Sequence, residues 1–153
     1  MKKIIIIFIV IVALGLGIYY GRYFFTNKVV KEESPILNTS TENQILKQGS
    51  FEEIDFIHKG SGNAMLLSGQ NGQKVLRLEN FQVTNGPDLY VYLSRNPQPN
   101  GDTNSLGDFI NLGRLKGNMG NQNYEINQNI DGYDTVVIWC QQFGVLFSFA
   151  VLR

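Results

Sequence analysis

Two residues carry chemistry that the rest of the chain does not duplicate: the single cysteine, Cys140, and the single histidine, His58. A thiolate exchanges with disulfides, is oxidised to a sulfenic acid, or binds haem iron. An imidazole transfers protons or binds metals near neutral pH. One cysteine makes no disulfide within a chain, and one histidine excludes histidine-rich metal sites and the copper site built from two histidines and a cysteine.

The element that carries Cys140 is the run TVVIWCQQF, residues 135–143. It is apolar on both faces, which is typical of a central β-strand. Alternation along this strand places Cys140 on the same face as Val136 and Ile138, which favours burial of the thiol as a small hydrophobe. The turn expected at Phe143 and Gly144 follows closely, so Cys140 is expected near one end of the sheet. Both a core role and a reactive role remain open at this point.

Other motifs do not predict a catalytic or metal site. GSG at residues 60–62 begins like a nucleotide-binding loop, but Met65 stands where GxGxxG requires glycine. Neither CxxCH nor GxSxG occurs. The acidic run FEEID, residues 51–55, is interpreted as a solvated strand edge. The segment NGDTN, residues 100–104, imitates a calcium loop, but Ser105 replaces the required glycine and Asn111 the bidentate acid, so a polar surface loop is expected.

The pattern of the chain after residue 45 predicts an all-β fold, an antiparallel β-sandwich or a barrel-like domain. KVLRLENFQV (74–83), DLYVYLS (88–94) and GVLFSFAVL (144–152) alternate with period two, as half-buried strands do. In the last run, Val145, Phe147, Phe149 and Val151 are expected on one face. Turn sequences separate the runs, including NG at 71–72, NGPD at 85–88 and DG at 131–132.

Three regions are predicted: a membrane segment at 1–25, a polar spacer at 26–45 and a β domain at 46–153. Residues 4–20 carry no charge, and aromatic residues follow them, which indicates an uncleaved signal anchor, a single transmembrane helix. A cleaved signal peptide, with a loose site at 13–15 or 15–17, is the alternative. The β domain is expected outside the cytoplasm. NTS at 38–40 fits a glycosylation sequon.

The charge of the β domain indicates which partners it does not have. Acidic residues slightly outnumber basic residues in 46–153, and no basic stripe is present. Nucleic acids are recognised first through such a basic surface. A nucleic-acid partner is therefore not expected, and the membrane is the partner that the sequence itself indicates.

The runs NGPDLYV (85–91), LGRLKGN (112–118) and VIWC (137–140), together with HKGSG at 58–62, resemble the DM-thirteen family of electron-transfer domains. The resemblance extends over about residues 48–152. It implies an extracytoplasmic redox module in which Cys140 acts either as a bare thiol or as a ligand to haem. His58 corresponds to the family's histidine and is carried over as a candidate partner in cofactor binding. An unidentified redox partner protein is also implied.

Each version of this chemistry has requirements that a structure tests. A reactive thiol needs solvent access and positive neighbours, for which Arg114, Lys116 and His58 are available. A haem needs an apolar cavity, which Phe143, Phe147 and Met65 are candidates to line. The hypothesis of a different class is a non-catalytic binding or adhesion module, displayed on the membrane, in which Cys140 is a core residue. The sequence does not establish that the protein is an enzyme.

Overall fold

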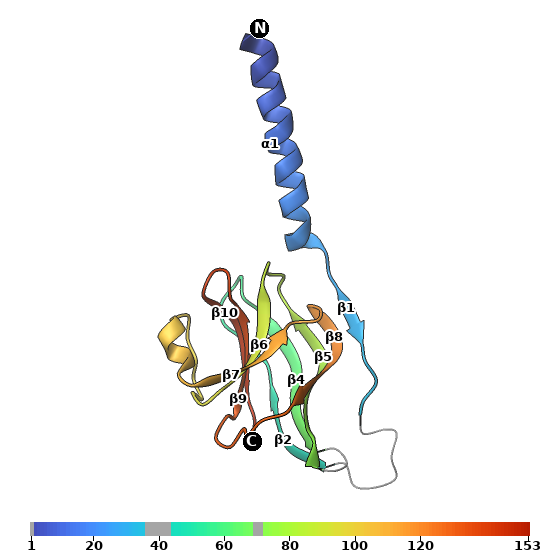
Figure 1. The fold of residues 1–153 in the computed structure, drawn as a ribbon, viewed down its shortest axis with the longest axis vertical. Helices are drawn as coiled ribbons and strands as arrows, with labels where there is room; N and C mark the ends of the chain where they lie inside the picture. Colours follow the sequence, from blue (N-terminus) through green and yellow to red (C-terminus); the bar gives the residue numbers. More distant parts are fainter. Residues whose placement is uncertain (1, 36–43, 69–71) are drawn as a thin grey trace.

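The computed structural model describes residues 2–35, 44–68 and 72–153. The candidate sequon at 38–40 and the first residue of the NG turn at 71–72 lie outside these ranges. A long helix, α1 (Lys2–Phe25), precedes a domain of two packed sheets (Figure 1). The prediction of an all-β domain after one apolar helix is confirmed.

The helix α1 extends away from the two sheets (Figure 1). Its side chains from Ile4 to Ile18 include a long series of exposed Ile, Val, Leu and Phe residues. Residues Lys2–Tyr19 are long and apolar enough to cross a membrane, and a signal sequence has the same properties.

The first sheet contains five strands in the order β1-β8-β5-β4-β2, all antiparallel except for the parallel pair β1 and β8. Their bounds are β1 (Val29–Lys31), β2 (Gln44–Ser50), β4 (Gly60–Ser68), β5 (Lys74–Val83) and β8 (Met119–Ile126).

The second sheet is antiparallel throughout, in the order β3-β10-β9-β6-β7. Its strands are β3 (Glu52–Glu53), β6 (Leu89–Ser94), β7 (Phe109–Arg114), β9 (Thr135–Cys140) and β10 (Val145–Val151). A short 3₁₀ helix, η2 (Thr103–Leu106), lies in the connection between β6 and β7.

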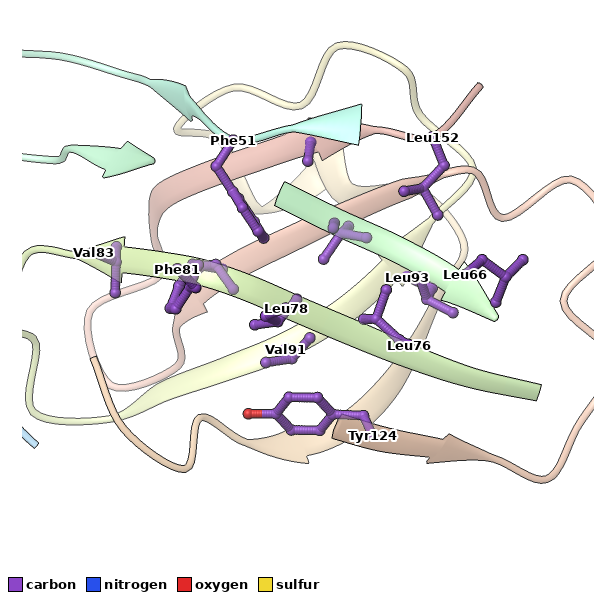
Figure 2. Packing of buried hydrophobic residues seen from close by; sticks show 14 of the residues in the cluster. Phe51, Leu66, Leu76, Leu78, Phe81, Val83, Val91, Leu93, Tyr124 and Leu152 are labelled. Carbon is purple, nitrogen blue, oxygen red and sulfur yellow. The ribbon is translucent and has the colours of Figure 1, made fainter. Parts of the chain in front are cut away.

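The main core fills the space between the two sheets. Leu76 and Leu78 of β5 face Val91 and Leu93 of β6 across it (Figure 2). The strand β6 confirms the predicted alternation, because Leu89, Val91 and Leu93 enter this core while its two tyrosines lie on the other face.

A second apolar cluster covers the outer face of the second sheet. It combines Tyr92, Val137, Trp139 and Leu146 with Leu106 from η2. The strand β9 therefore meets apolar side chains on both faces, and all six of its residues are buried. This confirms the prediction of a central strand, since β9 lies between β10 and β6.

A β-bulge corrects the predicted faces of β10. The register shifts between Leu146 and Ser148. Phe147 joins the main core, whereas Phe149 packs with the outer cluster, so the expected shared face of Phe147 and Phe149 is wrong. One extra residue in one strand reverses the side chains that follow it, and the apolar pattern does not reveal where that residue is inserted.

The polar stretch after α1 also differs from the expected spacer. Its residues 29–31 form β1, and the backbone N–H of Lys28 donates to Asn118 Oδ1 at 2.7 Å. The close approach of this strand depends on Gly120, where φ is +100° and an added Cβ would clash with the carbonyl oxygen of Val30. The backbone of the chain that leaves α1 is thus hydrogen-bonded to the domain from Lys28, the third residue after the helix.

We expect Gly120→Ala to destabilise the domain and release β1. The left-handed backbone and the clash with Val30 together predict a loss of about 2 kcal/mol or more in the free energy of unfolding. Urea denaturation measures this loss, and faster hydrogen exchange of the Glu32 amide, which bonds to the Asn121 carbonyl, reports the release of β1. Gly101→Ala is the control, because an added Cβ meets nothing there. Equal stability of both variants would contradict the assignment of β1.

Candidate functional site

Four loops and the end of α1 meet at one end of the sandwich, which we call the proximal end. It comprises residues 54–59, 84–88, 115–118 and 141–144. The strand register establishes this placement. In the first sheet, β1 and β8 start at the same level, and Met119 at the start of β8 lies opposite Gln82 near the end of β5. Gly60 at the start of β4 lies opposite Val83 at the end of β5. In the other sheet, Leu89 at the start of β6 lies opposite Cys140 at the end of β9.

The sequence runs that suggested a redox domain converge on the proximal end. At this end lie the loop 84–88, the end of the run LGRLKGN, His58 and Cys140. His58 and Cys140 are 82 positions apart in the chain. Figure 1 shows the turn into β10 and the loop into β6 at the end of the sandwich nearest α1, with the C-terminus at the other end.

Cys140 lies in the core beneath the turn 141–144. Its exposed fraction is 0%, and it belongs to the main core cluster together with Leu89 and Phe147. Two backbone hydrogen bonds hold the turn above it: Gly144 N–H donates to the Cys140 carbonyl at 2.9 Å, and Gln141 N–H donates to the Asp88 carbonyl at 2.9 Å. The predicted burial is confirmed, and access of any reagent to the thiol requires the protein to open.

The proximal end is packed tightly around the ring of Phe147. A Cβ added to Gly86 would lie 2.8 Å from Phe147 Cζ and 2.8 Å from Leu89 Cδ2. On another side, the ring of His58 meets the ring of Phe147 edge to face, with 4.6 Å between centroids. The structure therefore brings His58 and Cys140 to one end of the core, with Phe147 contacting the first and sharing a cluster with the second.

The loop 54–59 orients His58 through Asp55. Oδ1 of Asp55 accepts hydrogen bonds from the backbone N–H groups of Ile57 at 2.7 Å and His58 at 2.6 Å, and Oδ2 lies 2.8 Å from His58 Nδ1. The hydrogen bond from the His58 side chain, followed by that from its backbone, lowers the pKa of Asp55 to about 2. An ionised carboxylate only accepts hydrogen bonds, so Nδ1 of His58 carries a proton.

The basic side chains expected near the thiol bind acidic partners. Arg114 forms an ion pair with Asp88 and donates from Nε to the Tyr90 hydroxyl at 3.1 Å. Lys116 pairs with Glu32 of the segment after β1, at 2.8 Å. These contacts stabilise the loops of the proximal end and the segment that follows α1.

The residues present do not fit a haem bound to Cys140. Of the three side chains expected to line its cavity, Phe143 is exposed, Phe147 fills the core, and Met65 lies between the core residues Ala64 and Leu66 on the opposite face of β4. Four hollows on the surface of the described part of the chain are lined by other residues, and Cys140 lines none of these four. Among the described residues, no group of three or more His, Cys, Asp or Glu is arranged to hold a metal ion.

A buried amide anchors the loop 115–118 from below. Gln122 of β8 is fully buried. Its Nε2 donates a hydrogen bond to the Gly117 carbonyl at 2.6 Å. Its Oε1 accepts hydrogen bonds from the Tyr124 hydroxyl at 2.9 Å and from the Lys116 backbone N–H at 3.2 Å. Gln122 was not among the residues singled out from the sequence. Its burial could have been predicted from the period-two pattern of β8, which places Gln122 on the same face as Tyr124 and Ile126.

One protein-family model matches the chain. The model described as "Electron transfer DM13" matches residues 50–152, which is most of the chain and nearly the whole two-sheet domain. No curated protein and no solved structure matches the chain.

We expect Cys140 to react with an aromatic disulfide reagent on the order of 10³-fold more slowly than an exposed cysteine, because burial permits reaction only after an opening that costs several kcal/mol. The exposed comparison is Gln142→Cys in a Cys140→Ser background, two positions along the same chain. Release of the coloured thiol measures both rates. Similar rates would show that the thiol is accessible and would contradict the packing of the turn.

The order of the loop 54–59 should depend on the Asp55 carboxylate. A folded-state pKa of about 2, below the ordinary value of 3.8, means that this contribution is complete above about pH 4 and is lost as the pH falls toward 2. Carboxyl NMR of the folded chain should show Asp55 titrating near 2. Asp55→Asn should speed hydrogen exchange at the Ile57 and His58 amides at neutral pH, whereas Asp131→Asn should not. Titration near 4 would contradict the three hydrogen bonds.

Proposed function

Since the chain belongs to the Electron transfer DM13 family, we propose that it is a membrane-anchored, extracytoplasmic redox domain in which Cys140 is the residue that exchanges electrons. The observation that carries this proposal is the position of the single cysteine. Cys140 lies inside the matched region, at the end of the sandwich where the family-like runs converge and beneath a short turn.

Membrane anchoring is supported by α1. The apolar side chains of the helix from Ile4 to Tyr19 are exposed on all sides, as expected of a segment whose solvent is lipid. A single span next to a polar domain is the arrangement of a signal anchor, with the domain on the exported side. His58 enters the proposal as a residue that positions Phe147, which belongs to the same core cluster as Cys140, through the contact between the two rings.

The chemistry we propose is thiol–disulfide exchange with a partner protein. The Cys140 thiolate forms a bond to one sulfur of a partner disulfide, and the other sulfur leaves as a thiolate that takes up a proton. A thiolate of a second partner then attacks the Cys140 sulfur of the mixed disulfide, and the first partner's remaining sulfur leaves as a thiolate that takes up a proton. The second partner's other thiolate attacks its own sulfur in this new mixed disulfide, forms the second partner's disulfide and releases Cys140 as a thiolate. Two electrons have then passed from the two thiols of the second partner to the first partner's disulfide.

Access to the thiol is the step that the structure makes demanding. Opening the turn 141–144 requires breaking the hydrogen bonds from Gly144 to Cys140 and from Gln141 to Asp88. Both lie at the end of the sandwich and outside the ladder of β9 with its neighbours, so opening them leaves the sheet intact.

The second candidate is a non-catalytic binding or adhesion module, and the complete burial of Cys140 favours it. In that case the thiol is a small hydrophobe of the core and is exposed only when the whole domain unfolds. The two candidates therefore predict different routes of exposure.

The test measures how exchange with a small disulfide depends on urea below the unfolding transition, using the full chain in detergent micelles. A redox Cys140 should react through local opening, at a rate nearly independent of urea, because local opening exposes little surface. The matched control is Val91→Cys in a Cys140→Ser background, since Val91 is fully buried in the same core within β6 and should react only on global unfolding. Equal rates with equal urea dependence would overturn the redox proposal and support the binding module.

A further inference from the structure

Three large apolar side chains are exposed at the proximal end, on the loops and not on the sheets. Phe56 is 84% exposed and Ile57 55% exposed, both in the loop 54–59, and Phe143 in the turn 141–144 is 59% exposed. Apolar groups of this size normally find a place in the core, and clusters left outside mark contact with another phase or protein.

The two segments that carry these residues leave the sheet side by side. β3 pairs antiparallel with β10, with Glu53 opposite Ser148 and Glu52 opposite Phe149. The loop that follows β3 and the turn that precedes β10 therefore emerge from the same end of neighbouring strands. The contact of His58 with Phe147 ties the base of the loop to β10.

This end of the domain is also the end to which α1 is attached. Four residue steps join Phe25, the last residue of α1, to Val29, the first residue of β1. Four extended residues span at most about 14 Å, so the start of β1 cannot lie farther than this from the end of the helix. Asn27 shortens the connection further, because its side chain bonds to Asn118 at 2.9 Å and to Asn85 at 3.2 Å.

We propose that Phe56, Ile57 and Phe143 insert into the interfacial layer of the bilayer that α1 spans, so that the sandwich docks on the membrane by its proximal end. This inference rests on the membrane anchoring in the proposed function and adds a second attachment. Moving a Phe or Ile side chain from water into an apolar phase is favourable, and the helix already holds this end of the domain near the surface.

The charges around the loop tips indicate the kind of lipid surface. Lys59 pairs with Glu53 at 3.3 Å, and the Asp55 carboxylate is bonded to backbone N–H groups and His58 at the base of its loop. Because Lys59, the lysine of this loop, is already paired with an acidic side chain, attraction to anionic lipid is not required. Docking driven by apolar burial should occur on neutral phosphatidylcholine and should not weaken with salt.

The experiment places a tryptophan at each loop tip of the full chain in phosphatidylcholine nanodiscs. Phe56→Trp and Phe143→Trp should lose emission when the lipids are replaced by lipids brominated in the upper acyl chain, at low and high salt. The control is Phe109→Trp, because Phe109 is also exposed but lies at the end of the sandwich opposite the proximal end. This position follows from the register: Phe109 pairs with Ser94 at the end of β6, and Ser94 pairs with Thr135 at the start of β9. The wild-type chain corrects for Trp139, which is buried.

Quenching of both loop variants, with Phe109→Trp and the wild type unaffected, is the expected result. Equal emission in brominated and plain lipids at both loop positions would overturn the docking proposal. A blue shift without quenching would also overturn it and would indicate a protein partner or a second copy of the chain.

A separate measurement distinguishes failure of this inference from failure of the proposed anchor. Resistance of the full chain to alkaline extraction from vesicles reports whether α1 is inserted. A chain that is extracted has no membrane anchor, whereas a chain that resists extraction but shows no quenching has an anchor without docked loops.

Discussion

The burial of β9 on both faces is the constraint on which the rest of the structure depends. Each of its six residues is buried, because the main core covers one face and the cluster beneath the β6–β7 connection covers the other. A strand without a solvent face holds its neighbours in register from both sides. It also places Cys140 in the main core, because Val136, Ile138 and Cys140 share the inner face.

The same constraint separates the two ways in which a lone thiol participates in redox chemistry. A haem ligand needs a cavity beside the sulfur, and the side chains at the proximal end fill that space, with Gly86 already close to Phe147 and Leu89. A thiol that exchanges with a disulfide needs only transient access, and the turn that directly follows Cys140 is held by two hydrogen bonds that lie outside the sheet ladder. The packing therefore favours exchange by opening over a resident cofactor.

The sequence predicts the regular parts of this molecule and misses those that depend on distant pairing. Alternation in 88–94 and the two-sided apolar run 135–140 suffice for the central strands and for the burial of Cys140. The bulges in β5 and β10 each insert a residue that leaves no mark on the apolar pattern. β1 has only three residues, and its partner lies about 90 positions later, so nothing local distinguishes it from a spacer.

The positions of Phe143 and Cys140 connect the two proposals. Both belong to one short connection: Phe143 projects outward from the turn, while Cys140 lies beneath it and bonds to its last residue, Gly144. If the turn is docked on the bilayer, motion of the turn and contact with lipid are coupled, because withdrawal of the Phe143 ring from lipid has a cost of its own. A partner would then meet the opened thiol at the bilayer surface and would have to approach along the membrane plane.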